Sequence, residues 1–165
     1  MSFEEFVAAR GAVLLRFSVM LTGDRHRAED LVQVVLARVY GQRWKRIAAM
    51  ERPEAYLKRM LVNEHLRWWR RRSSRETSTA QPQDLAPVQP DSQDAHAARE
   101  AAWELLGRLP SRQRAVLVLR YYEDLSDVQI AEVLGCRPVT VRSQATRALA
   151  TLRAVLPAID REALP

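Results

Sequence analysis

Apolar residues recur at intervals of three and four along most of the chain, a spacing that places them on one face of an α-helix. In the N-terminal half this pattern predicts three helices, over about residues 2–22, 27–44 and 53–72. In the C-terminal half it predicts four shorter helices, over about residues 96–107, 111–122, 127–134 and 138–155. No segment alternates between apolar and polar residues as a half-buried strand would, so we expect an all-α fold.

Residues that commonly cap helices stand before several of these segments. Ser2 followed by Glu5, and Ser126 followed by Gln129, match the capping box, in which each side chain accepts a hydrogen bond from the other residue's backbone N–H. Ser111 is also expected to be the N-cap of its helix.

Residues 73–95 differ in composition from both flanking segments. They hold three of the eight Pro, no aromatic residue and a net charge of −3, whereas residues 1–72 carry +7 and residues 96–165 carry +2. Such a segment cannot bury much apolar area, so we interpret it as a flexible linker. The chain is therefore predicted to contain two small helical domains, at 1–72 and 96–165, joined by a linker at 73–95.

The charge balance favours a polyanionic partner. Lys and Arg number 26 against 20 Asp and Glu, which gives a net charge of +6 and points to nucleic acid. The longest run without a charged residue has seven residues, far short of a membrane span. The start, MSFEEF, is acidic where a signal peptide would be basic, so we expect a cytoplasmic protein with no membrane partner.

The chain lacks the residue groupings of common enzymes. Five Gly disfavour Gly-rich phosphate loops, and a single Cys excludes an internal disulfide or a multi-thiolate metal site. The three His, at positions 26, 65 and 96, are scattered, and no H-E-x-x-H, G-x-S-x-G or P-loop motif occurs. We therefore expect no catalysis, no cofactor, no metal and no small-molecule substrate.

Residues 126–149, SDVQIAEVLGCRPVTVRSQATRAL, have the order of a helix-turn-helix. Ala131 is small where the helices cross, Gly135 permits the sharp turn, and apolar residues hold the second helix in place. Hydroxyl and arginine side chains follow, of the kind that contact phosphates and base edges in a major groove. The predicted DNA-binding residues are Arg137, Pro138, Thr140, Arg142, Ser143 and Arg147. The alternative, an ordinary pair of helices with a solvated arginine face, is disfavoured by the ordered set of small, turn and apolar residues.

A second basic cluster ends the third predicted helix. Arg67-Trp68-Trp69-Arg70-Arg71-Arg72 combines four guanidinium groups with two indoles, which suits a surface that follows a DNA backbone and stacks on separated bases. In the alternative interpretation one Trp is a core residue, and the arginines solubilise the helix end and interact favourably with the negative end of the helix dipole. The pattern alone leaves both interpretations open.

The order of these motifs resembles that of the extracytoplasmic-function sigma factors of the sigma-70 family, which are dissociable subunits of bacterial RNA polymerase. Residues 28–40, AEDLVQVVLARVY, resemble region 2.2, which docks on the polymerase clamp. Residues 53–72 resemble regions 2.3 and 2.4, which melt and read the −10 element, and residues 106–153 resemble region 4, which reads the −35 element. The run VNEHLRWWRRRSSRE is closest to the SigE-type actinobacterial group.

The resemblance implies roles for individual residues. Asp30 and Gln33, three apart on one helix, share a face that would contact the clamp. The −10 element would be contacted by Asn63, Arg67, Trp68, Trp69, Arg70 and Arg71. The chain departs from the family at Leu36 and Tyr40, where Phe and Trp are frequent, and at Arg67, where many members carry Asp. These departures concern the detailed −10 contacts and not the class of protein.

The function that the resemblance implies is that of a promoter-specificity subunit, which recognises −35 and −10 elements and starts transcription. Its partners would be promoter DNA and the clamp and flap of core RNA polymerase, and an anti-sigma factor is left open. The alternative is a conventional dimeric helix-turn-helix regulator. An acidic linker between two basic domains, and a second basic cluster at 67–72, favour the sigma factor because a dimeric regulator needs neither.

Overall fold

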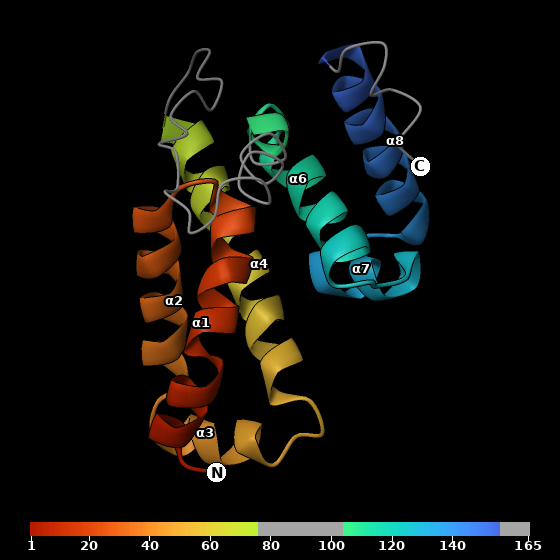
Figure 1. Ribbon diagram of the computed structural model, residues 1–165. Helices are drawn as coiled ribbons and strands as arrows, with labels where there is room; N and C mark the ends of the chain where they lie inside the picture. Colours follow the sequence, from red (N-terminus) through yellow and green to blue (C-terminus); the bar gives the residue numbers. More distant parts are fainter. Residues whose placement is uncertain (76–103, 156–165) are drawn as a thin grey trace, which may run out of the picture. The chain divides into compact units, whose positions relative to one another are not determined.

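The computed structural model describes residues 1–75 and 104–155 of the chain. These residues are helical or lie in short connections, and no strand occurs among them (Figure 1), which confirms the predicted all-α fold. The chain divides into two units, Met1–Arg75 and Glu76–Pro165. Most of the predicted linker, and most of the helix predicted over 96–107, lie outside the described residues; residues 104–107 are helical.

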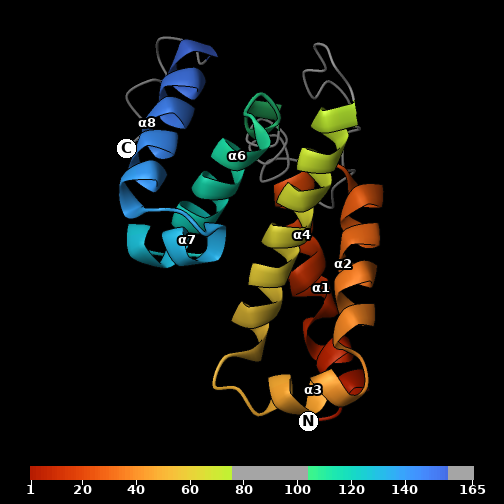
Figure 2. The ribbon, with the colours of Figure 1, turned by 180° about the vertical axis from the view of Figure 1, so that it is seen from behind.

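The first unit is a bundle of three long helices with a short fourth helix across one end. The long helices α1 (Phe3–Thr22), α2 (Arg25–Val39) and α4 (Pro53–Arg75) pack against one another, and α3 (Gln42–Ala48) joins α2 to α4 across their end (Figure 1 and Figure 2). Burying a large apolar side chain stabilises a fold by about 1.5–3 kcal/mol. The largest such side chains fully buried here are Phe6, Leu14, Phe17, Leu21, Leu57 and Leu61.

The prediction of one continuous helix over 27–44 is wrong, because the structure divides this segment into two helices, α2 and α3. Gly41, between them, has a φ of 77°, a conformation that glycine adopts without a steric cost. Trp44 is then buried against α1, with its ring 4.8 Å from that of Phe6 and its Nε1 donating a hydrogen bond to the Met1 carbonyl. The break thus places an indole in the core, which helical spacing alone does not reveal.

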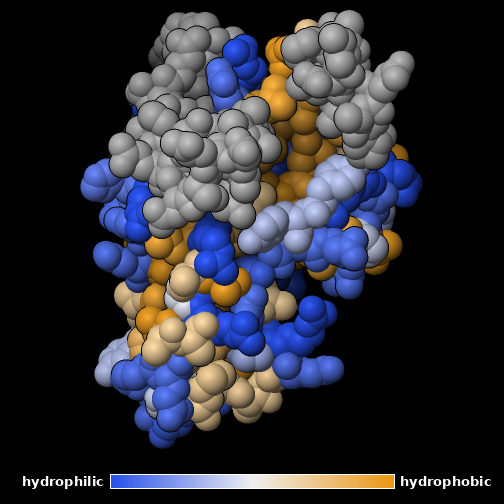
Figure 3. All heavy atoms as spheres, in the orientation of Figure 1, coloured by the Kyte–Doolittle hydropathy of each residue, from blue (hydrophilic) through white to orange (hydrophobic). Residues whose placement is uncertain are grey.

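The second unit is built around its last helix. α6 (Ser111–Leu117) continues into a π-helical turn, η1 (Val118–Tyr122), and is followed by α7 (Asp127–Leu134) and α8 (Pro138–Val155). Both α6 and α7 pack on α8. In Figure 3 the hydrophobic side chains of this unit gather between α8 and the segment that leads into α6. The buried cluster there consists of Leu109, Leu117, Ala148 and Leu152.

Both predicted capping boxes are confirmed. The Ser2 hydroxyl accepts a hydrogen bond from the Glu5 N–H at 3.0 Å, and the Ser2 N–H donates to the Glu5 carboxylate at 2.7 Å. Ser126 and Gln129 make the same pair of bonds at the start of α7. The N-cap predicted at Ser111 is wrong: this serine is already the first helical residue, because the carbonyl of the preceding residue accepts the Arg114 N–H.

Candidate nucleic-acid interfaces

The helix-turn-helix predicted from the sequence is present in α7 and α8. The capping box fixes the start of α7, and Gly135 ends it with a φ of 65°, in the left-handed region. The N–H groups of Gly135 and Cys136 both donate to the Ala131 carbonyl, so the turn is held by backbone hydrogen bonds. The chain then enters α8 at Pro138, whose missing N–H is not needed in the first turn.

α8 separates an apolar face from a polar one. Val141, Ala145, Ala148 and Leu152 are buried against the rest of the unit. The residues predicted to bind DNA lie in the turn and in the first three turns of the helix. Those with exposed side chains are Arg137, Arg142, Ser143 and Arg147, while Pro138 and Thr140 are half-buried. The structure therefore brings all six onto one short stretch, with four of them open to a ligand.

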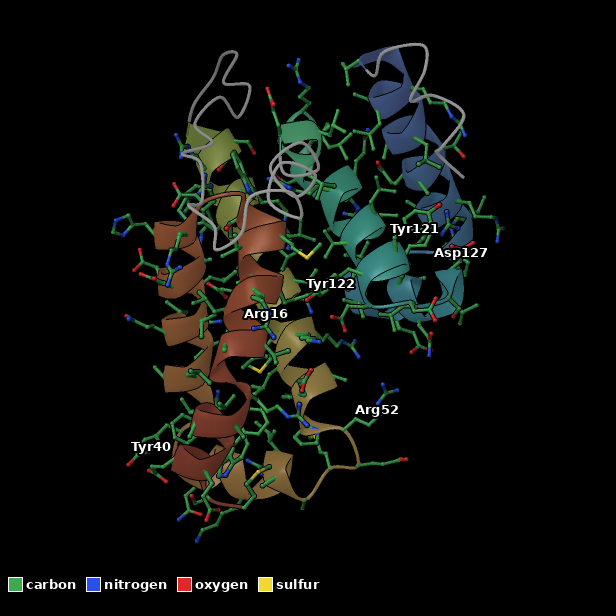
Figure 4. The ribbon with its side chains drawn as sticks, viewed as in Figure 1. Arg16, Tyr40, Arg52, Tyr121, Tyr122 and Asp127 are labelled. Atoms are coloured by element: carbon green, nitrogen blue, oxygen red, sulfur yellow. The ribbon has the colours of Figure 1, made fainter. Side chains whose placement is uncertain are left out.

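Asp127, the first residue of α7 and labelled in Figure 4, contacts two arginines. Its carboxylate forms an ion pair with Arg120 and lies 4.0 Å from Nη1 of Arg142. The Arg142 side chain remains 60% exposed, so this long contact leaves its guanidinium open to a ligand. The sequence analysis did not identify this role of Asp127, although an acidic residue in a first helical turn is a familiar capping signal.

The second group of predicted DNA-binding residues lies on the last four turns of α4. Arg67, Arg70 and Arg71 are exposed, and Asn63, Trp68 and Trp69 are half-buried. The C-terminal end of a helix carries partial negative charge, so an arginine run is electrostatically favourable there even without a ligand. The group is therefore assembled in one place, and its members differ in what they contact.

Trp68 and Trp69 are held by two arginines. Their rings meet edge to face with centroids 5.0 Å apart. The Arg27 guanidinium, from α2, lies 4.1 Å from the Trp68 centroid and 5.0 Å from that of Trp69, and Arg72 lies somewhat farther from both. Burial lowers the pKa of Arg27, Arg72 lowers it further, and Asp24 opposes both. The pair is thus neither a fully buried core element nor a freely exposed stacking surface.

Glu64 gathers three arginines from two helices. Its buried carboxylate forms an ion pair with Arg38 of α2 through Oε2. The same carboxylate lies 3.5 Å from Nη1 of Arg67 and 3.4 Å from Nη2 of Arg71, both on its own helix. Two of the predicted DNA-binding arginines are therefore partly engaged within the protein, and the sequence analysis did not identify either Arg38 or Glu64 as their neighbours.

The predicted polymerase-binding face of α2 is open to solvent. Asp30 and Gln33 are both exposed, while Leu31, Val35 and Val39 are buried in the bundle as expected from their spacing. A carboxylate and an amide three residues apart on a helix can accept hydrogen bonds from one basic partner surface.

The described residues, 1–75 and 104–155, form neither a metal site nor a membrane span. No grouping of His, Cys, Asp and Glu there could hold a metal ion. None of the helices in that part of the chain combines the length and apolar character needed to cross a membrane.

Two family models match this chain. Residues 6–75 match Sigma-70 region 2, and residues 99–152 match Sigma-70, region 4. The first match ends where α4 ends, and the second contains the helix-turn-helix.

Curated relatives match over almost the full length. The chain is 40% identical over 163 residues to the RNA polymerase sigma-E factor of Streptomyces avermitilis, covering 99% of this chain and 89% of that one. It is also 40% identical to the RNA polymerase sigma-E factor of Streptomyces coelicolor over 99% of this chain and 90% of that one. The ECF RNA polymerase sigma factor SigL of Mycobacterium tuberculosis is 35% identical over 88% of this chain and 83% of its own.

A solved structure shares the fold. The sigma factor RpoE from Bartonella quintana, in complex with the anti-sigma factor NepR, matches with a TM-score of 0.65 and 24% sequence identity. The match covers 92% of this chain and 94% of that one.

Proposed function

Because the chain belongs to the sigma-70 family, as an RNA polymerase sigma factor of the extracytoplasmic-function type, we propose how its two units divide promoter recognition between them. The domain at 1–72 binds core polymerase and the −10 element, the domain at 96–165 binds the −35 element, and the segment at 73–95 links them. The protein acts in the cytoplasm, where polymerase and DNA are, and contributes no catalysis of its own.

The observation that carries the −35 assignment is the exposure pattern of α8. One face packs on the unit through Val141 and Ala145, while Arg142, Ser143 and Arg147 point away from it. A helix-turn-helix places its second helix in the major groove with the N-terminal residues at the base edges. Arg142 lies in the second helical turn and is assigned to a base, whereas Arg147 lies farther along and is assigned to phosphate.

The −10 assignment concerns the end of α4. Exposed arginines next to half-buried indoles suit a separated strand, whose backbone needs cations and whose bases need flat apolar partners. We assign phosphate contacts to Arg67, Arg70 and Arg71. The half-buried Trp68 and Trp69 lie beside these arginines, with the Arg27 guanidinium over their rings. Asn63, one turn earlier on the helix, completes the surface.

Core polymerase is the partner of both units in this proposal. Asp30 and Gln33 face its clamp from α2, and the second unit meets its flap. Each unit then binds DNA weakly alone, and polymerase supplies the second contact at high effective concentration. An anti-sigma factor, as named for the Bartonella structure, is a further partner to test by co-purification.

In vitro transcription tests the proposed function. Purified core polymerase is incubated with genomic fragments, with and without the full chain. We expect discrete transcripts that require the chain and start downstream of shared −35 and −10 sequences. The proposal would be overturned if core polymerase started transcription at the same sites without the chain. A two-fold symmetric footprint formed without polymerase would indicate the dimeric regulator instead.

A further inference from the structure

The carboxylate of Glu64 has more cationic partners than it can satisfy. Three guanidinium groups, each with five N–H donors, meet one carboxylate with two oxygens. A net charge of +2 therefore remains on the cluster of Glu64, Arg38, Arg67 and Arg71, and many of its N–H donors stay available.

The three pairs are unequal in geometry. Arg38 makes the closest contact, and it reaches across from α2. Arg67 and Arg71 sit at 3.5 and 3.4 Å with side chains 54% and 56% exposed, which makes them loose surface pairs. Such pairs contribute little to stability and are readily exchanged for another anion.

The two loose pairs do not serve helix packing. Arg67 and Arg71 belong to the same helix as Glu64, so their contacts tie no second element to α4. The junction between α2 and α4 is tied by Arg38 and by the contact of Arg27 with the two indoles. A carboxylate that engages two exposed arginines on its own helix can instead alter what those arginines do for a ligand.

We propose that Glu64 is an intramolecular competitor for DNA phosphates, which weakens sequence-independent binding by Arg67 and Arg71 and so increases promoter selectivity. This inference rests on the proposed role of α4 in binding DNA. Sequence-independent affinity comes mostly from phosphate contacts, so arginines held by a carboxylate contribute less on random DNA. On a promoter, base contacts elsewhere hold α4 against the strand, and the two side chains transfer to phosphates.

The test measures binding of the full chain to single-stranded DNA of mixed sequence by filter binding, across about 50 to 200 mM salt. Glu64→Gln keeps the shape of the side chain and removes its charge. We expect about two- to tenfold tighter binding, the range that two released surface pairs allow, and a log–log salt dependence steeper by about one unit.

Matched variants identify the cause. Glu4→Gln removes the same charge from an exposed position in the first turn of α1, and an equal gain there would overturn the inference in favour of net charge. The gain from Glu64→Gln should disappear when Arg67 and Arg71 are both Ala. It should persist with Arg70→Ala, since Glu64 pairs with Arg67 and Arg71 but not with Arg70, which follows it by six residues. Unchanged or weaker binding by Glu64→Gln also overturns the inference.

Failure of the proposed function has a different signature. If changing both Arg67 and Arg71 to Ala leaves DNA binding and promoter opening unaltered, α4 does not bind DNA through these arginines, and their −10 assignment falls together with this inference. If Glu64→Gln does not fold, as judged by its circular dichroism, Glu64→Asp replaces it. The shorter side chain keeps the buried charge but withdraws it from Arg67 and Arg71, so a smaller gain is expected and its absence overturns the inference.

Discussion

Ser2 and Glu5 close the first turn of α1 with reciprocal hydrogen bonds, and this sets the acidity of Glu5. The pKa of Glu5 is lowered, first by the Ser2 backbone N–H and then by the Ser2 side chain. A carboxyl whose pKa is lowered by folding contributes stability above its unfolded pKa, and that contribution is lost as the pH falls through the folded pKa. The N-terminal turn should therefore fray in acid.

Substitution of Ser2 separates the two hydrogen bonds. Ser2→Pro removes the N–H donor and the hydroxyl together, and the φ of −69° at this position suits proline. We expect an NMR titration to show a Glu5 pKa below the ordinary value for glutamate in the unmodified chain and a return to that value in Ser2→Pro. Ser2→Ala keeps the N–H and should give an intermediate pKa. Equal pKa values in all three proteins would refute the role of the capping box.

Arg142 and Arg147 should differ in what their loss does to DNA binding. Losing a bidentate base contact costs about 1–3 kcal/mol at one position of the site. Arg142→Ala should therefore relax the −35 preference. Arg147→Ala should weaken binding to all DNA sequences about equally and lower the slope of log affinity against log salt concentration by about one unit. A library selection for −35 sequences and a salt titration on both variants measure this. An unchanged −35 preference in Arg142→Ala would contradict the base contact.

At the scale of the elements, helical spacing and capping patterns were enough to place most of the helices. Both capping boxes and the turn at Gly135 are local features, and local sequence determines them. The division of α2 from α3 was missed because Trp44 is buried by a tertiary contact with α1. Gly41 was the available signal, since glycine commonly marks a helix end.

In the candidate interfaces too, the sequence predicted local features but not the contacts between helices. The helix-turn-helix order predicted which residues share α8, because those residues are neighbours in the sequence. The contacts of Arg27 with the indoles and of Arg38 with Glu64 join separate helices. The spacing of the arginines along the chain does not distinguish Arg27 and Arg38 from the others, so it could not predict these contacts.

The connection between α2 and α3 should be sensitive to the loss of its glycine. Gly41 has a positive φ, and no atom would lie within 4 Å of an added Cβ, so Gly41→Ala costs only backbone strain. The ψ of Gly41, −131°, lies outside the left-handed helical region, in a conformation that only glycine adopts readily, so we expect a loss of about 1–3 kcal/mol in the free energy of unfolding by denaturant. Gly11→Ala is the matched control, since its Cβ would meet Val7 at an ordinary 3.7 Å inside α1. That substitution should instead stabilise the protein by about 0.5–1 kcal/mol.

At the scale of the whole molecule, we propose that the two units carry separate surfaces for one complex of polymerase and promoter DNA. The first unit presents Asp30 and Gln33 on α2 and the arginines of α4, and the second presents α8. Each surface is small and polar, as expected when a larger assembly supplies most of the affinity.

Changing Asp30 and Gln33 together to Ala tests the polymerase contact. Neither side chain is buried, so the helical circular dichroism should be unchanged. Losing two hydrogen bonds to a charged partner should weaken binding to core polymerase by about tenfold or more. Glu29→Ala is the control, because Glu29 lies next to Asp30 but pairs with Arg25. An unaltered affinity in the double variant would remove α2 from the clamp interface.

The paired indoles also give the protein an optical reporter of its own. Half of the chain's four Trp stand edge to face at the end of α4, each within 6 Å of two guanidinium groups. Indole emission shifts in wavelength and intensity when nearby charges or solvent rearrange. A phosphate that draws Arg72 away, or a base that contacts the half-buried rings, should therefore change the intrinsic fluorescence. Rapid-mixing experiments with the unlabelled protein could then follow the arrival of α4 at a promoter in real time.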